Sequence, residues 1–223
     1  MNPHMTDQPT RHSDRVRDRR IEQVVPLVSP AELLEELPLG PAEEDAVLRS
    51  RAEIARILDR DDDRLLVIVG PCSVHDVEAA RDYAHRLAAR AAELGDDPFV
   101  AIVSRTTESQ IHRQLASGLS MPVGFKNGTD GTVKVAVDAV RAAAARHAFA
   151  GVNLDGTPSI LHTTGNEDCH VILRGGRGAP NHGAGPVAES LAQLDAAGLP
   201  QRIVIDASHE NSGKDHQRQP QVV

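Results

Sequence analysis

The sequence predicts an α/β fold with parallel strands, and two features of its 223 residues carry that prediction. Short apolar runs alternate with helical patterns from residue 64 onward, which is typical of repeated strand–loop–helix units. Each predicted strand is also followed by a polar or ionisable residue, at the strand end where parallel α/β folds place their sites. The periodicity alone does not distinguish an open sheet from a closed barrel.

The N-terminal part is expected to consist of two segments. Residues 1–20 are strongly charged, without apolar periodicity, and are interpreted as a disordered leader. Residues 21–60 are expected to form an arm followed by a helix. Three prolines punctuate 21–39, Ser29 before Pro30 predicts the start of a short helical turn, and apolar residues at helical spacing predict an amphipathic helix over 43–59.

Residues 61–223 are expected to form the main domain. The apolar run 64–69 predicts a buried strand that ends at Gly70-Pro71, and Asp76 and Gly95 are suited to begin and end the helix that follows. Further strands are predicted at 100–103, 122–125, 170–173 and 202–205, with helices around 110–115, 132–145 and 187–197.

Composition excludes several classes of protein. A net charge of −8 argues against a nucleic-acid partner, because that affinity comes mainly from neutralising phosphates. No apolar run approaches the ~18 residues of a membrane span, and no secretory signal is recognisable. The two cysteines, Cys72 and Cys169, form no CxxC pair, which argues against a disulfide framework and favours a reducing cytoplasm.

Five residues that follow five predicted strands are candidates for a common site: Cys72, Arg105, Lys126, Arg174 and His209. A thiolate and an imidazole are ligands for a soft or borderline metal ion. Arginine and lysine side chains bind phosphate and carboxylate groups. Together these residue types indicate a metal-assisted site for a small phosphorylated acid.

Each of these residues also has a purely structural interpretation. A single cysteine at a strand end is usually a packing residue, and a single histidine is often structural. Arg105, with Thr106, Thr107 and Glu108, is compatible with an ordinary capped helix start, and the glycine-rich loop after Arg174 matches neither a Walker loop nor a GxGxxG motif. The convergence of all five at one edge of the sheet favours a functional site.

Four segments resemble the type I DAHP (3-deoxy-D-arabino-heptulosonate 7-phosphate) synthases, the first enzymes of the shikimate pathway. The segments are GPCSVHD (70–76), RTTESQIHRQLASGLSMPVGFKNGTDGT (105–132), GNEDCHVILRGG (165–176) and DASHENSGKDHQRQP (206–220). These motifs are long and specific, and the resemblance runs from about residue 21 to residue 223. The chain is therefore identified as a member of this family of transferases of aromatic amino-acid biosynthesis.

The resemblance implies a (β/α)8 TIM-type barrel that condenses phosphoenolpyruvate with erythrose 4-phosphate and releases phosphate. By motif matching, Cys72 and His209 would bind a divalent metal ion of the Mn, Fe, Co or Zn class. Arg105 and Arg174 would bind the phosphoenolpyruvate phosphate. Lys126 would lie against the carboxylate and the reacting carbons, so that Lys126 and His209 are the expected catalytic residues. The arm at 21–39 resembles the family's N-terminal extension, which helps to form the dimer and the feedback site, so that a dimer-forming or regulatory role is implied for residues 21–60.

The chain also departs from the family pattern. The family has a long block, including a KPRT-type segment that binds erythrose 4-phosphate, where this sequence passes from Phe99 almost directly to Arg105. The family's glutamate and aspartate ligands lie beyond the last residue, Val223. We therefore expect an internal deletion, a missing C-terminus, about five of the eight barrel strands and weakened metal binding.

Three functions remain open at this stage. The chain is a DAHP synthase that acts as a homo-oligomer or with a partner; it is an inactive remnant that keeps a partial phosphate-binding edge or associates with a full-length synthase; or it is an α/β binding module for phosphorylated metabolites. The binding of erythrose 4-phosphate is the least supported, since the segment that would hold its phosphate is absent.

Overall fold

The computed structural model describes residues 23, 25–70, 76–95, 99–101, 104–106 and 109–223, with the backbone alone described at 100, 101 and 104–106. Its strands form three sheets: a parallel pair β1-β2, a parallel four-stranded sheet in the order β3-β4-β7-β8, and an antiparallel pair β5-β6. A mixed α/β fold with parallel strands is thus confirmed. The described strands do not close into a barrel.

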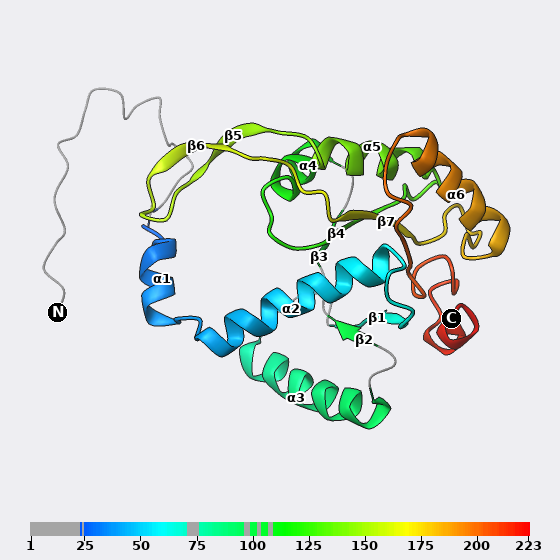
Figure 1. Ribbon diagram of the computed structural model, residues 1–223, viewed down its shortest axis with the longest axis horizontal. Helices are drawn as coiled ribbons and strands as arrows, with labels where there is room; N and C mark the ends of the chain where they lie inside the picture. Colours follow the sequence, from blue (N-terminus) through cyan, green and yellow to red (C-terminus); the bar gives the residue numbers. More distant parts are fainter. Residues whose placement is uncertain (1–22, 24, 71–75, 96–98, 102–103, 107–108) are drawn as a thin grey trace, which may run out of the picture.

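Three helices precede or flank the first strand (Figure 1). Helix α1 (Pro30–Glu36) begins with the expected cap, in which Ser29 and Glu32 bond reciprocally to each other's backbone amides. Helix α2 (Pro41–Leu58) crosses the molecule and buries Ile54 and Leu58. Helix α3 (Val77–Leu94) follows β1 (Leu66–Ile68) and begins at the Asp76 cap, as the sequence predicts.

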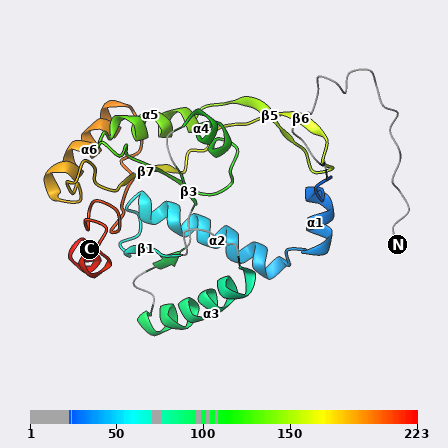
Figure 2. The same cartoon turned by 180° about the vertical axis from the view of Figure 1, so that it is seen from behind.

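The four-stranded sheet positions the candidate site. It contains β3 (Ser104–Thr106), β4 (Val123–Lys126), β7 (Cys169–Leu173) and β8 (Ile203–Ile205), all parallel. Helices α4 (Gln110–Ala116), α5 (Lys134–Ala143) and α6 (Ala184–Ala196) connect these strands, with α5 and α6 on one side of the sheet and α2 on the other (Figures 1 and 2). A short 3-10 helix, η1 (His216–Gln221), ends the chain.

Alternate residues of β4 and β7 point to opposite faces of the sheet. Val123 and Phe125 on β4, with Val171 and Leu173 on β7, pack with α5 in the apolar core. The intervening positions face the other way, so that Gly124 lies opposite His170 and Lys126 opposite Ile172. This second face lies toward β1 and α2 and leads to the polar residues at the strand ends.

Two parts of the fold differ from the sequence-based expectation. The strand predicted at 100–103 is instead divided into β2 (Phe99–Ala101), which pairs with β1, and β3, which pairs with β4. A hairpin that the sequence analysis missed, β5 (Ala148–Val152) and β6 (Pro158–His162), extends toward α1. The Leu154 carbonyl in its turn accepts a hydrogen bond from the Ala31 amide of α1 at 2.8 Å.

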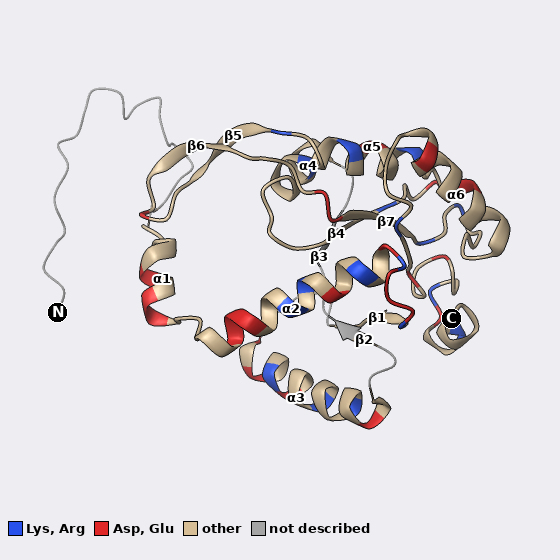
Figure 3. Ribbon diagram, in the orientation of Figure 1, with Lys and Arg blue, Asp and Glu red and all other residues tan. Residues whose placement is uncertain are grey.

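Charged side chains are distributed unevenly over these elements (Figure 3). Acidic residues gather on α1 and the first turns of α2, where Glu43 and Glu44 lie near the helix N-terminus and complement its dipole. No helix among the described residues combines the length and the apolar character needed to cross a bilayer.

Candidate functional site

The carboxyl ends of β4, β7 and β8 bring three ionisable residues to one edge of the sheet. Lys126 is the last residue of β4, while Arg174 and Asp206 directly follow β7 and β8. The three strands are parallel neighbours in the order β4-β7-β8, with Lys126 opposite Ile172 and Leu173 opposite Ile205. The fold therefore places Lys126 and Arg174, two of the five nominated residues, at one edge of the sheet, together with Asp206.

Asp206 lies between two of the residues that the sequence nominated. Its Oδ2 atom is 3.7 Å from the Lys126 Nζ and 2.8 Å from the His209 Nδ1. The Asp206 side chain is only 4% exposed, whereas that of His209 is 37% exposed. Asp206 thus joins a residue of β4 to the loop after β8, across the end of the intervening strand β7.

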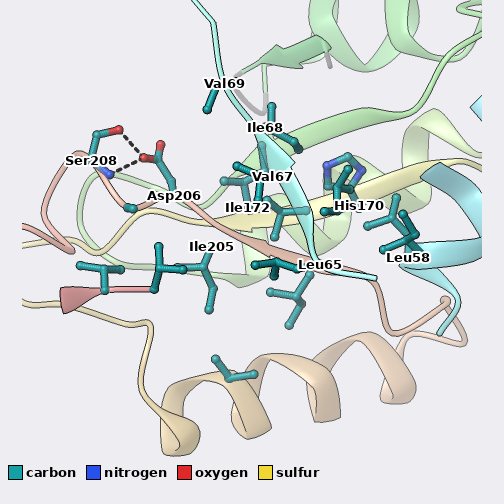
Figure 4. A pocket seen from close by; sticks show the side chains of 18 of the residues that line it. Leu58, Leu65, Val67, Ile68, Val69, His170, Ile172, Ile205, Asp206 and Ser208 are labelled. Carbon is teal, nitrogen blue, oxygen red and sulfur yellow. Dashed lines mark hydrogen bonds between the residues drawn. The ribbon is translucent and has the colours of Figure 1, made fainter. Parts of the chain in front are cut away.

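The Asp206 carboxylate is ionised in its buried position. Burial by itself would raise the pKa of this group, but hydrogen bonds from the Ser208 hydroxyl and amide to Oδ1, at 2.5 and 2.9 Å, have the opposite effect (Figure 4). Electrostatic interactions with the neighbouring His209 and Lys126 side chains also lower it, and the net result is a pKa below the ordinary value. The site therefore contains a fixed negative charge behind its cationic side chains.

Arg174 is held by a buried asparagine that the sequence analysis did not select. Asn127 follows Lys126, and its Oδ1 accepts the Arg174 backbone amide at 2.8 Å while its carbonyl accepts the Arg174 Nε at 3.0 Å. The Asn127 side chain also donates to the Gly175 carbonyl. Since only Nε is used in these bonds, the two terminal amino groups of Arg174 have no partner among the described residues.

A second buried asparagine fixes the loop that carries His209. The Asn211 Nδ2 donates to the Leu173 and Asp206 carbonyls at 3.0 and 2.9 Å, and its Oδ1 accepts the Asn181 amide. The only sequence signal for Asn127 and Asn211 is that they lie one and two residues after the predicted site residues Lys126 and His209.

Gly176, in the loop after Arg174, is needed for close packing, because a Cβ there would lie 2.2 Å from the Gly131 nitrogen.

Two of the five nominated residues are not placed with the others. Cys72 lies outside the described residues. Arg105 lies in β3, where its backbone is in register with Gly124, but its side chain is outside the described part of the structure. Among the described residues, Asp206 therefore links Lys126 to His209. The placement of the Cys72 and Arg105 side chains in the site stays a prediction.

A cavity of about 820 Å³ lies beside the site, between β1 and the sheet (Figure 4). Aliphatic side chains from β1, β7, β8 and α2 form most of its wall, and Asp206 and Ser208 border one end. The His170 side chain also lines it; this residue is 1% exposed, and neither ring nitrogen has a hydrogen-bond partner among the described residues. Burial lowers the pKa of His170 to about 4, so that its imidazole is neutral at pH 7.

The described residues offer part of a metal site. They contain no cluster of three or more histidine, cysteine, aspartate or glutamate side chains arranged to hold a metal ion. However, the His209 Nδ1 lies 2.8 Å from the buried Asp206 Oδ2, although neither atom has a well-aligned hydrogen bond among the described residues, and Nε2 has no hydrogen-bond partner among them. Metal-binding histidines commonly have such a carboxylate behind them, so the donor chemistry fits one imidazole ligand.

Comparisons with a family model and with known proteins all relate this chain to one family of enzymes. The family model described as the DAHP synthetase I family matches residues 42–103 and 98–223, two segments that overlap at 98–103, a stretch that contains β2 and ends directly before β3. A phospho-2-dehydro-3-deoxyheptonate aldolase of Corynebacterium glutamicum is 40% identical, with 92% of this chain and 75% of that protein aligned. The Phe-sensitive aldolase of Escherichia coli K12 is also 40% identical, with 92% and 79% aligned.

The Corynebacterium alignment spans 277 positions although this chain has 223 residues, so that relative contains residues without a counterpart here. A solved phospho-2-dehydro-3-deoxyheptonate aldolase from Francisella tularensis superposes with a TM-score of 0.82 at 32% identity, over 91% of this chain and 80% of that one. The family predicted from the motifs is confirmed, as is the enzyme class, a transferase. This chain belongs to the DAHP synthetase I family.

Proposed function

We propose that this chain carries the condensing site of a DAHP synthase, at which phosphoenolpyruvate joins erythrose 4-phosphate to give DAHP and phosphate. The observation that carries the proposal is the grouping of Lys126, Arg174, Asp206 and His209 at the carboxyl ends of three adjacent parallel strands. Family membership supplies the reaction, and this grouping supplies side chains of the right chemistry for an anionic substrate.

Arg174 is proposed to bind the phosphate of phosphoenolpyruvate together with Arg105. The bond from its Nε to the Asn127 carbonyl fixes the guanidinium plane, so that its two terminal amino groups can bind two phosphate oxygens at once. Lys126 is proposed to bind the substrate carboxylate. Its Nζ lies 3.7 Å from the Asp206 Oδ2, which holds the amino group at the edge of the sheet where the substrate is proposed to bind.

Cys72 and His209 are proposed to hold a divalent metal ion of the Mn, Fe, Co or Zn class. When bound, such an ion supplies a Lewis acid for the aldehyde oxygen of erythrose 4-phosphate. The residues of the chain bring the enol carbon of phosphoenolpyruvate to the aldehyde carbon, where the new carbon–carbon bond forms. Water then adds at the second carbon of phosphoenolpyruvate, and the carbon–oxygen bond to the phosphate breaks.

A specific observation supports a second candidate, an inactive remnant of the enzyme. Relatives contain residues that this chain lacks, and the two matched segments overlap at 98–103, a stretch that ends directly before β3. We propose that the β1-β2 and β3-β4-β7-β8 sheets are parts of an incomplete (β/α)8 barrel. The absence of a KPRT-type segment then weakens the binding of erythrose 4-phosphate.

The region 21–60 is proposed to form contacts between subunits, either in a homo-oligomer or with a full-length relative. Its apolar side chains are exposed along and around α1, and the β5-β6 hairpin, which meets α1 at the Ala31–Leu154 hydrogen bond, exposes further apolar side chains. The exposed residues are Leu27, Val28, Leu33, Leu34, Leu37, Leu39, Val152, Leu154 and Ile160. Apolar surface of this extent commonly marks a protein interface.

Phosphate release tests the catalytic proposal directly. The purified chain is incubated with Mn²⁺, phosphoenolpyruvate and erythrose 4-phosphate, beside a Cys72→Ala control and a reaction without erythrose 4-phosphate. Turnover that needs both substrates and is abolished by Cys72→Ala supports the condensing enzyme. No turnover above that control contradicts it and favours the remnant.

Calorimetry with phosphoenolpyruvate alone separates a binding edge from a purely structural one. We expect binding that Arg174→Ala weakens by ten-fold or more, since a bidentate arginine–phosphate contact is lost. Binding that is unaffected by Arg174→Ala or Arg105→Ala would contradict the proposed roles. Light scattering, followed by mixing with a tagged full-length relative, distinguishes a homo-oligomer from a mixed assembly.

A further inference from the structure

The Asp206 carboxylate uses its two oxygens for different purposes. Oδ1 accepts two hydrogen bonds from Ser208, one from the amide and one from the hydroxyl, and these fix the orientation of the carboxylate. Oδ2 has no well-aligned hydrogen bond from a described residue, although it is nearly buried. The local turn therefore explains the position of Oδ1 but not that of Oδ2.

The second oxygen faces two residues from different parts of the sheet. The His209 Nδ1 lies 2.8 Å away, within the loop that follows β8, and the Lys126 Nζ lies 3.7 Å away, at the end of β4. A carboxylate needed only to cap its own turn would have no reason to lie between an imidazole and an ammonium group. These contacts involve two of the residues to which the proposed function gives catalytic roles.

We propose that Asp206 is a positioning residue for the site: its Oδ2 sets the orientation and tautomer of the His209 ring and holds the Lys126 ammonium at a fixed place. A carboxylate oxygen accepts a proton and repels a lone pair, so an imidazole nitrogen 2.8 Å from it carries the ring proton, which leaves the lone pair on Nε2. The same oxygen draws Lys126 toward His209. This inference rests on the proposed function, since it assigns a role within that site.

The neighbouring hydrogen bonds make this orientation rigid. Asn211 donates to the Asp206 carbonyl, and the Asp206 amide donates to the Leu173 carbonyl at 2.8 Å, so that the backbone of Asp206 is fixed to the end of β7. The Lys214 amide donates to the His209 carbonyl at 2.7 Å. Precise orientation of a metal-binding imidazole depends on this kind of support.

The first test reads the His209 tautomer in the metal-free chain. Two-bond proton–nitrogen NMR spectra of protein labelled with ¹⁵N-histidine distinguish a ring protonated on Nδ1 from one protonated on Nε2. The His209 signals are assigned by their loss in His209→Gln. We expect the Nδ1–H tautomer in the unsubstituted chain at pH 8; a ring with its proton mainly on Nε2 would overturn the proposal, even if every Asp206 variant failed to fold.

The second test replaces Asp206 with asparagine, which keeps the size of the side chain and can still accept the Ser208 hydrogen bonds. The amide Nδ2 would then face the His209 Nδ1 as a donor, so the ring should change to the Nε2–H tautomer. Calorimetric affinity for Mn²⁺ alone should fall ten- to one-hundred-fold, and Asp206→Glu should restore part of it.

Asp215→Asn is the matched control for the second test. Asp215 also accepts a backbone amide two residues ahead, that of Gln217, at 2.9 Å, but it begins η1 and contacts neither Lys126 nor His209. We expect the His209 tautomer and the Mn²⁺ affinity of the Asp215→Asn variant to match those of the unsubstituted chain. A folded Asp206→Asn variant that also keeps both properties would overturn the proposal. Absent turnover would instead contradict the proposed function alone, because neither measurement uses the substrates.

Discussion

Arg202 binds Asp59 through two parallel hydrogen bonds, Nε to Oδ1 at 2.5 Å and Nη2 to Oδ2 at 2.6 Å. The two residues are 143 positions apart in the sequence: Arg202 directly precedes β8, and Asp59 directly follows α2. The remaining terminal nitrogen of Arg202 donates to the Glu167 carbonyl and to Asp168. This buried guanidinium therefore fastens α2 to the amino-terminal edge of the sheet, opposite the edge that carries the candidate site.

We expect Arg202→Met to lower the free energy of unfolding by about 2–4 kcal/mol, because it leaves several acceptors without their donor near a partly buried carboxylate. Urea denaturation measures this effect. Arg86→Met is the matched control, since the Arg86–Asp82 pair on α3 is exposed and should contribute less than about 1 kcal/mol. Equal losses for the two variants would show that the Arg202–Asp59 contact does not fasten α2.

Gly124→Ala should destabilise the sheet by about 1–3 kcal/mol, as is usual when atoms are added to a tightly packed interior. A Cβ at this position would lie 2.3 Å from the Ile172 Cδ1 and 2.7 Å from the His170 Nε2, on the neighbouring strand. In an Ile172→Val background, which removes that Cδ1 atom, the loss should be smaller. Gly185→Ala in α6 meets nothing within 4 Å and should not destabilise the chain; a comparable loss there would contradict the packing explanation.

The parts of the fold that could be predicted are those with a local signal. The caps at Ser29 and Asp76 and the stop at Gly95 are found where the sequence places them, because capping depends on a few adjacent residues. The buried strand β7 (Cys169–Leu173) overlaps the strand predicted at 170–173, which contains three consecutive apolar residues at 171–173. The motifs at the strand ends identified the family, and the comparisons confirm it.

The parts that could not be predicted depend on pairing between distant segments. The β5 segment, Ala148–Val152, has alanine and glycine where strands usually have β-branched residues, and its pairing with β6 is what stabilises it. The division of residues 99–106 into β2 and β3 follows from their pairing with different partners. The contacts of Asp206 to Lys126 and His209 have no local signal in the sequence, because they come from tertiary structure.

His170 should make the stability of the chain depend on pH in the acid range. The pKa of this buried imidazole is about 4 in the folded state, against 6.5 as the ordinary value, so that below pH 6.5 the unfolded chain binds a proton that the folded chain does not. The contribution of His170 is therefore complete above pH 6.5 and is lost as the pH falls toward 4. At about 1.4 kcal/mol per pH unit, the loss amounts to about 3 kcal/mol.

Urea denaturation of His170→Leu between pH 8 and pH 4 checks this expectation. The variant places an apolar side chain, which cannot be protonated, among the aliphatic residues of the cavity. It should therefore lose less stability over this pH range than the unsubstituted chain. His85→Leu, on the exposed surface of α3, is the control and should leave the pH profile unchanged. Identical profiles for His170→Leu and the unsubstituted chain would mean that His170 is not buried as a neutral ring.

Cys169 should resist alkylation as long as the chain is folded. Its side chain is buried in the apolar core, and the residue is only 2% exposed. Burial raises the pKa of the thiol to about 12, and the negative charge of Asp168 contributes to this rise as a smaller cause. Because the thiolate is the reactive form, both access and ionisation act against the reaction.

Iodoacetamide labelling followed by mass spectrometry tests this in the Cys72→Ala variant, where Cys169 is the only cysteine. We expect no label at pH 8 in the native state and complete labelling in urea. Partial labelling that increases with urea in step with global unfolding would still agree with a core position, since the thiol would then react only from the unfolded state. Rapid labelling without denaturant would contradict it, and would show that β7 separates from α5 in the folded chain.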